Sequence, residues 1–170
     1  MSTNYSGETF FKNAKFYKLS LFINHYKYFD LYSKRIYDVL KHLSCEYLDF
    51  YNWYWNTQIP RVIQRNGDII FCIINSKIVG VANLKKDKKE VKLCTLFVSK
   101  NYRKSHIGTI LVEKSFIYLG TTKPLITIPD YKIVLFKNII DKYEWKCTQI
   151  LDKGYYNKSC REFVYNGFIY

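Results

Sequence analysis

Three strand-like runs follow one another in the middle of the chain, and they constrain its fold more than any other feature. β-Branched and aromatic residues dominate Asp68–Ile74, Lys77–Leu84 and Val91–Val98. The turn-like pair Asn75-Ser76 separates the first two runs, and the lysine-rich stretch LKKDKKEVK separates the second from the third. Because short turns join antiparallel neighbours, the sequence predicts a three-stranded antiparallel meander.

A basic loop and an amphipathic helix follow the meander. The loop holds Arg103 and Lys104, and apolar or small residues then recur at helical spacing between Gly108 and a natural stop at Gly120. The N-terminus of such a helix attracts anions, since its dipole and its unpaired N–H groups both favour negative charge. Gly108 leaves room for a ligand to approach. A pyrophosphate would suit this loop; the alternative is a basic loop that only caps the helix.

The remaining runs extend the same pattern of strands and helices. Pro124–Ile128 predicts a short strand, and the two late runs KCTQIL and CREFVYNG predict an antiparallel pair. Upstream, AKFYKLSLF predicts a first strand, followed by helices that end near Leu43 and that span about Tyr47 to Gln64. The element order predicts an α/β (α+β) fold with a mixed sheet. A further helix over Tyr131–Tyr143 would bury one side, made of Leu135, Phe136, Ile139 and Ile140.

Length and composition narrow the class of protein. A chain of 170 residues without repeats or linkers is the size of one domain, so we expect residues 1–170 to form a single domain. No apolar run approaches the ~18 residues that span a bilayer. The five cysteines show no CxxC pair, and the first residues lack the apolar core of a leader. We therefore expect a soluble, cytoplasmic protein with reduced thiols, no metal site and no membrane partner; its oligomeric state stays open.

The net charge is +13 and is spread along the chain. A field of this sign attracts polyanions. Nucleic acid, the ribosome, acidic proteins and a phosphate-rich cofactor are therefore all candidate partners.

The loop in its setting resembles a known family. A strand, an Arg-x-x-Gly-x-Gly-like loop and a helix, with a hairpin before and a strand–helix unit after, are similar to the GNAT superfamily of acyl-CoA-dependent N-acetyltransferases, over roughly Asp68 to Val164. The first glycine of the pattern is His106 here, whereas the second is kept as Gly108. The resemblance implies a mostly antiparallel central sheet with splayed fourth and fifth strands. It also implies that the pyrophosphate of acetyl-CoA binds at Arg103, Lys104, Ser105, His106, Ile107, Gly108 and Thr109.

The same resemblance implies a place for the rest of the cofactor. The strand before the loop would pair with the pantetheine amides as an extra strand would, through the main chain of Leu96, Phe97 and Val98. This edge would face Leu125–Thr127, and a main-chain N–H near Val98 would stabilise the oxyanion.

Catalytic side chains are harder to assign. Acyl transfer to an amine needs a base, and Glu90 at the start of the fourth strand is the candidate, on one face with Lys92, Cys94 and Leu96 if strict alternation holds. The alternative for Glu90 is a solvated turn residue. The family's usual tyrosine acid falls on Ile140, so Tyr143 is the nearest substitute, although tyrosines are abundant in this chain. Cys94 as a covalent nucleophile is a weaker alternative.

These observations lead to two hypotheses of function. The first is an N-acetyltransferase that moves an acetyl group from acetyl-CoA directly to a primary amine, with the charge favouring a large anionic acceptor such as aminoacyl-tRNA, ribosomal protein or another protein. The alternative is a catalytically degenerate GNAT-fold module that binds protein or nucleic acid, motivated by Ile140, His106 and the weak case for Glu90.

Overall fold

Antiparallel pairing of the central runs builds the first sheet of the computed structural model, which describes residues 13–157 and 159–170. The strands β2 (Gly67–Ile74), β3 (Lys77–Lys86) and β4 (Val91–Val98) form the expected meander, and β1 (Lys15–Lys18) pairs with β2 to complete the order β1-β2-β3-β4. The predicted meander is confirmed. The first twelve residues, where a leader was sought, lie outside the described part.

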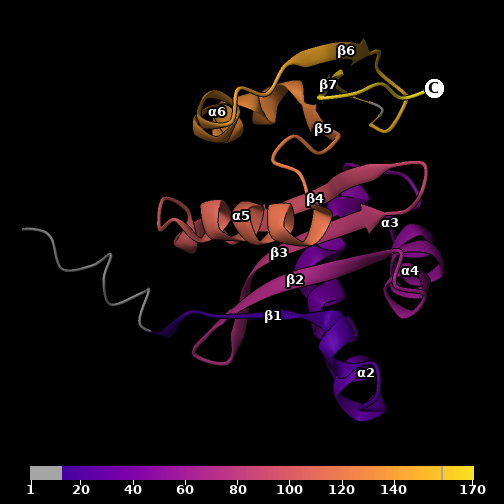
Figure 1. Cartoon of the computed structure of the whole chain (residues 1–170), viewed down its shortest axis with the longest axis vertical. Helices are drawn as coiled ribbons and strands as arrows, with labels where there is room; N and C mark the ends of the chain where they lie inside the picture. Colours follow the sequence, from indigo (N-terminus) through magenta and orange to yellow (C-terminus); the bar gives the residue numbers. More distant parts are fainter. Residues whose placement is uncertain (1–12, 158) are drawn as a thin grey trace, which may run out of the picture.

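Helices cover both faces of this sheet (Figure 1). One face carries α2 (Tyr26–Leu40) and a helical stretch in which α3 (Phe50–Trp53), a π-helical turn (Tyr54–Gln58) and α4 (Ile59–Ile63) follow without a break. The opposite face carries α5 (Ile107–Leu119), which ends at Gly120 with φ of 77°. Each face has its own apolar core. Short 3-10 turns link these elements: Leu19–Phe22, Lys41–Cys45, Lys100–Tyr102 and Asp130–Lys132.

A second, three-stranded sheet follows α5. It consists of β5 (Ile126–Pro129), β6 (Cys147–Leu151) and β7 (Glu162–Tyr165) in the order β5-β7-β6, all antiparallel. The helix α6 (Ile133–Lys142) connects β5 to β6, and Figure 1 shows it beside this sheet, beyond α5. The late pair of strands is thus confirmed, with β7 rather than β6 next to β5.

A β-bulge in β4 overturns the expectation that Glu90, Lys92, Cys94 and Leu96 share one face. Thr95 pairs with Asn83 and Leu93 pairs with Leu84, which leaves Cys94 as an extra residue. The alternation shifts by one position there, so Leu93 and Leu96 both pack against the core under α5. Leu96 therefore lies on the face opposite to the one that strict alternation from Glu90 and Lys92 requires.

The helix α6 also differs from its expected packing. None of its residues is fully buried, and Leu135, expected on the buried side, is 57% exposed. Phe136, Ile139 and Ile140 do pack partly against the core. Leu135 stays open because α6 borders a cleft instead of a closed core.

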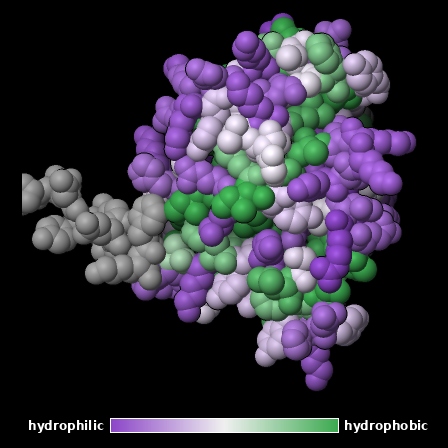
Figure 2. All heavy atoms as spheres, in the orientation of Figure 1, coloured by the Kyte–Doolittle hydropathy of each residue, from purple (hydrophilic) through white to green (hydrophobic). Residues whose placement is uncertain are grey.

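The surface is polar over most of the face seen in Figure 2, where hydrophilic side chains surround smaller hydrophobic patches. Within the described residues, no helix combines the length and the apolar character that crossing a bilayer requires. All five cysteines are free.

Candidate active site

The basic loop prepares the start of α5 for an anion. His106 is the residue before the helix and has φ of 62° and ψ of 0°, the left-handed conformation that glycine adopts most easily. Lys104 has φ of 63°. Two residues of the loop, Lys104 and His106, thus adopt the left-handed conformation just before the helix. His106 occupies the position where the GNAT pattern has its first glycine.

Within the described residues, no side chain caps the first turn of α5 by a hydrogen bond, and that turn contains no acidic residue. The leading N–H groups of a helix have no intrahelical partner, so those of Ile107, Gly108 and Thr109 are donors for a ligand. A Cβ at Gly108 would meet only Val98 Cγ2, at 3.6 Å, so the backbone is open on the ligand side. These features fit a diphosphate group.

The two sheets touch along only a short stretch and then separate. Leu125 bonds to both Val91 and Leu93: its carbonyl accepts from the Leu93 N–H at 3.0 Å, and its N–H donates to the Val91 carbonyl at 3.0 Å. Beyond this junction no ladder joins β4 to β5. The second half of β4 is therefore a free edge, next to the bulge at Cys94.

Main-chain groups line this free edge. The Ser99 N–H donates to the Val79 carbonyl on β3. Because successive residues of a strand point their N–H and C=O groups to alternate sides, those of Val98 and Leu96 point away from β3, toward the space between β4 and β5. The Arg103 Nε donates to the Val98 carbonyl at 3.2 Å, which confirms that this carbonyl points off the sheet. An extended ligand can add to such an edge as a strand does.

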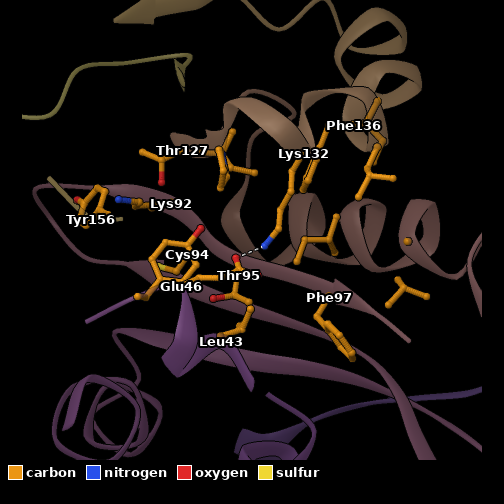
Figure 3. A pocket seen from close by; sticks show the side chains of 18 of the residues that line it. Leu43, Glu46, Lys92, Cys94, Thr95, Phe97, Thr127, Lys132, Phe136 and Tyr156 are labelled. Carbon is orange, nitrogen blue, oxygen red and sulfur yellow. Dashed lines mark hydrogen bonds and ion pairs between the residues drawn. The ribbon is translucent and has the colours of Figure 1, made fainter. Parts of the chain in front are cut away.

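A cleft of about 1000 Å³ joins these parts. It runs from the start of α5, between β4 and β5, to the segment that connects α2 to α3. Figure 3 shows an apolar part with Phe97 and Phe136, and a polar part toward which Lys92, Lys132, Glu46 and Thr127 point. A long ligand with one charged and one apolar portion would match this division.

A bridge of polar contacts crosses the polar part of the cleft. Glu46, after α2, accepts a hydrogen bond from Lys132 Nζ, which Figure 3 marks with a dashed line. It also accepts one from the Tyr131 hydroxyl, at 2.6 Å. Burial raises the pKa of the Glu46 carboxyl, but these two donors outweigh it, so the pKa lies below its ordinary value. Nearby, Tyr47 pairs with Asn157 in an isolated antiparallel bridge. Segments far apart in the sequence thus close over this end of the cleft.

The predicted cofactor residues are brought together. The cleft is lined by nearly all of them: Leu96, Phe97, Val98, Arg103, Lys104, His106, Gly108 and Thr109. Ser105 turns its hydroxyl back to the Tyr102 carbonyl, and Ile107 is buried against the core, so neither side chain faces the cleft.

The two predicted catalytic residues lie apart. Glu90 lines the cleft, but its carboxylate forms an ion pair with Lys85 at 2.8 Å. The Tyr143 hydroxyl donates to Glu113 on α5 at 3.0 Å, and Tyr143 is not among the residues that line the cleft. Sequence reasoning missed the polar end of the cleft. Its members Glu46 and Lys132 are 86 positions apart and carry no local signal that would pair them.

Comparisons with known proteins agree with this geometry. The sequence model of the acetyltransferase (GNAT) family matches residues 30–121, more than half of the chain. A search of curated proteins found no significant match.

Solved structures share the fold at low sequence identity. A protein from Desulfovibrio desulfuricans, described as a GNAT-family acetyltransferase, superposes with a TM-score of 0.66 at 10% identity, over 89% of this chain and 96% of its own. The ribosomal-protein-S18-alanine N-acetyltransferase of Escherichia coli gives 0.54 at 14% identity, over 78% and 84%. A Bacillus anthracis protein described as a streptothricin acetyltransferase, solved with acetyl coenzyme A, gives 0.53 at 15% identity, over 66% and 70%.

The free edge of β4, the bulge beside it and the uncapped start of α5 thus occur in a chain that matches the family's sequence model and shares its fold. The chain belongs to the acetyltransferase (GNAT) family.

Proposed function

We propose that residues 1–170 act as one GNAT domain that transfers an acetyl group from acetyl-CoA to a primary amine. The observation that carries the proposal is the uncapped, acid-free first turn of α5, which opens into the same cleft as the free edge of β4. A diphosphate and an amide-containing arm fit these two features, in that order along the cleft. Acetyl-CoA carries both, and its thioester supplies the acyl carbon that an amine attacks.

Each part of the cleft has a role in this proposal. The N–H groups of Ile107, Gly108 and Thr109 hold the pyrophosphate, and the side chains of Arg103 and Lys104 add positive charge beside it. To do so, Arg103 exchanges its bond to the Val98 carbonyl for the phosphate, which frees the edge of β4 for the amides of the arm. A main-chain N–H of this edge stabilises the oxyanion.

The acceptor is proposed to be a large anionic molecule, such as aminoacyl-tRNA or a ribosomal or other protein. The support is the net charge of +13, which would draw a polyanion to the mouth of the cleft. Glu90 is kept as a candidate base that lies in the cleft. Tyr143 is not kept as the acid, because Glu113 already holds its hydroxyl.

Isothermal titration calorimetry with acetyl-CoA tests the proposal. The wild type should bind, whereas Arg103→Glu combined with Gly108→Asp should not, because both changes place carboxylates against the pyrophosphate. Lys153→Glu is the matched control for Arg103→Glu, since it changes the charge equally on an exposed residue away from the cleft. The proposal fails if the wild type does not bind at low salt, or if the double variant binds as the control does.

Turnover separates catalysis from mere binding. Free thiol released from acetyl-CoA in the presence of a charged tRNA pool or a protein extract should rise with enzyme concentration. Binding of acetyl-CoA without any thiol release from either pool would favour the degenerate binding module.

A further inference from the structure

A buried carboxyl lies next to the polar end of the cleft, and neither the ion pairs nor the hydrogen bonds of the described chain account for it. Glu162 is the first residue of β7, opposite Pro129 of β5 and Leu151 of β6. Its side chain belongs to a residue that is only 1% exposed, and within the described residues neither carboxyl oxygen has a hydrogen-bond partner. Leaving such a group unpaired in a protein interior costs several kcal/mol, so it calls for an explanation beyond packing.

The groups around Glu162 belong to the wall of the cleft. Tyr47 and Thr127 both line the cleft, and their hydroxyls lie near enough to the carboxyl to affect its charge without reaching hydrogen-bond geometry. Every element packed around it contributes a charged or titratable group: Lys92 from β4, Tyr131 and Lys132 after β5, and Tyr156 and Cys160 between β6 and β7. Of these, Lys92, Lys132 and Tyr156 also line the cleft.

None of the ion pairs within the described residues includes Glu162, whereas the two carboxylates that line the cleft, Glu46 and Glu90, each have a lysine partner. Lys132 is bound to Glu46, and Lys85 is bound to Glu90. Lys92 lies over the ring of Tyr156, with its Nζ 5.3 Å from the ring centre. The two lysines near Glu162 therefore moderate its charge from a distance but do not neutralise it.

Burial raises the pKa of Glu162 to about 7, and Tyr47 and the two lysines only partly oppose this rise. The pKa of Tyr47 is itself raised, by burial first and then by the charge of Glu162. The phenol of Tyr47 thus keeps its proton near neutral pH, whereas Glu162 can gain or lose one. A base is most useful when its pKa lies near the working pH.

We propose that Tyr47 and Glu162 form a proton relay that removes the proton from the acceptor amine. Tyr47 touches the acceptor, and Glu162 acts through it as a positioning residue that receives the Tyr47 proton. The inference rests on the proposed function, because it assigns the proton path of the same transfer. Glu90 lies at a different place in the cleft and is already paired with Lys85.

The amine nitrogen forms a bond to the acetyl carbonyl carbon, and the bond from that carbon to sulfur breaks. The proton that the nitrogen loses passes to the Tyr47 oxygen while the Tyr47 hydroxyl proton passes to the Glu162 carboxylate. The thiolate of coenzyme A then takes up this proton through solvent, which restores the carboxylate for the next turn.

Carbon-detected NMR of protein labelled with ¹³C at the glutamate carboxyl tests the contact without any acceptor. One resonance should titrate near pH 7, apart from the other glutamates, and it should vanish in Glu162→Gln. Tyr47→Phe should move that midpoint upward, since the phenol favours the charged carboxyl. Tyr51→Phe, an exposed tyrosine on α3, is the matched control and should leave it unchanged. An unmoved midpoint in Tyr47→Phe overturns the relay.

The pH dependence of thiol release tests the role in transfer. An arylamine such as p-anisidine is the probe acceptor, because it is already neutral in the pH range around 7 where the rise is expected, so its own ionisation does not mimic the enzyme's. The rate of thiol release should rise through about pH 7 in the wild type and in the control Tyr51→Phe. In Glu162→Gln and Tyr47→Phe, the rate of thiol release should no longer rise with pH through 7 and should be about 100-fold lower. Acetyl-CoA binding by these variants, measured by calorimetry, should stay unchanged.

The outcomes separate the two proposals. A rise of the rate through pH 7 that persists in Glu162→Gln overturns the relay even when acetyl-CoA binds, and loss of the rise in Glu90→Gln alone would assign the base to Glu90 instead. Failure of acetyl-CoA to bind the wild type overturns the proposed function, whatever the carboxyl does. If the wild type releases no thiol with the arylamine, the NMR shift caused by Tyr47→Phe decides.

Discussion

At the scale of single residues, Glu162 makes the stability of the fold depend on pH. Its pKa is about 7 in the folded chain against an ordinary 4.5, so the folded state binds this proton more tightly than the unfolded state does. Stability from this group is therefore full below about pH 4.5, declines as pH rises to about 7, and stays reduced above. The buried carboxylate thus costs the fold stability at neutral pH.

Glu162→Gln should remove this cost. The amide is neutral at every pH, so the free energy of unfolding of the variant should exceed that of the wild type by roughly 3 kcal/mol above pH 7 and match it near pH 4. Urea denaturation of both proteins at several pH values measures the difference. A difference that does not change with pH would mean that the fold leaves the pKa of the Glu162 carboxyl at its ordinary value.

His106 offers a test of backbone strain. Its φ of 62° suits glycine, and an alanine there pays the left-handed penalty of about 1 kcal/mol. His106→Gly should therefore be more stable than His106→Ala by about this amount in urea denaturation, and both variants lose the imidazole equally. Equal stability of the two would show that the turn relaxes. Since the loop is proposed to act through its amides, His106→Gly should also bind acetyl-CoA as the wild type does.

Local residues of the site could be predicted from the sequence, and distant ones could not. Arg103 and Gly108 lie five positions apart in one strand–loop–helix unit, so the neighbours that define their setting are visible in the sequence. Glu46 and Lys132 meet only because the segment after α2 closes over β5. Glu162 looked like an ordinary strand residue, since nothing in its neighbours shows that the cleft leaves it without a partner.

At the scale of elements, the strands of the meander and α5 could be predicted because period and turn residues agree. The face of Glu90 relative to Leu96 could not, because a bulge is a property of two paired strands: the extra residue Cys94 appears only against Asn83 and Leu84. The exposure of Leu135 on α6 has a similar cause. A helical stripe marks an apolar face, but it does not say whether protein or ligand covers that face.

Two glycines of the first sheet, Gly67 and Gly80, allow other parts of the chain to pack closely against their backbone. A Cβ on Gly67 would lie 2.2 Å from the carbonyl oxygen of Leu84, and one on Gly80 would lie 2.9 Å from Leu111 Cδ1 and 3.0 Å from Ile107 Cγ2. The Leu84 carbonyl is part of the backbone and cannot move aside as easily as the ends of the Leu111 and Ile107 side chains can. Gly67→Ala should therefore destabilise by about 3 kcal/mol and Gly80→Ala by about 1 kcal/mol, in the range of overpacked cores.

Thermal and urea unfolding of these two variants check the order. Gly80→Ala should also weaken acetyl-CoA binding several-fold, because Ile107 opens the helix that is proposed to hold the pyrophosphate. Gly154→Ala is no clean control, since Gly154 has a φ of 98°. Gly108→Ala serves instead for stability, as its Cβ meets only an ordinary contact. A Gly80→Ala protein less stable than Gly67→Ala would contradict the argument.

At the scale of the whole molecule, the backbone hydrogen bonds that join the two sheets within the described residues are those of Leu125 to β4. This narrow junction creates the cleft, and the closures at Glu46 and Tyr47 then limit its far end. In the proposed function, the acceptor amine reaches the thioester through this restricted end. The large positive charge would act earlier, while the acceptor approaches the molecule.

Salt dependence should show whether that charge serves an anionic acceptor. If the surface neutralises about three phosphates of a tRNA, raising salt from about 50 to 200 mM should weaken its apparent affinity roughly ten- to fifty-fold. Thiol release against the concentration of charged tRNA, measured at each salt, gives this slope. Calorimetry of acetyl-CoA at the same salts supplies the reference, because the diphosphate contact alone should respond far less. A tRNA slope no steeper than that of acetyl-CoA would indicate a small acceptor, whose amine the cleft recognises without help from the surface.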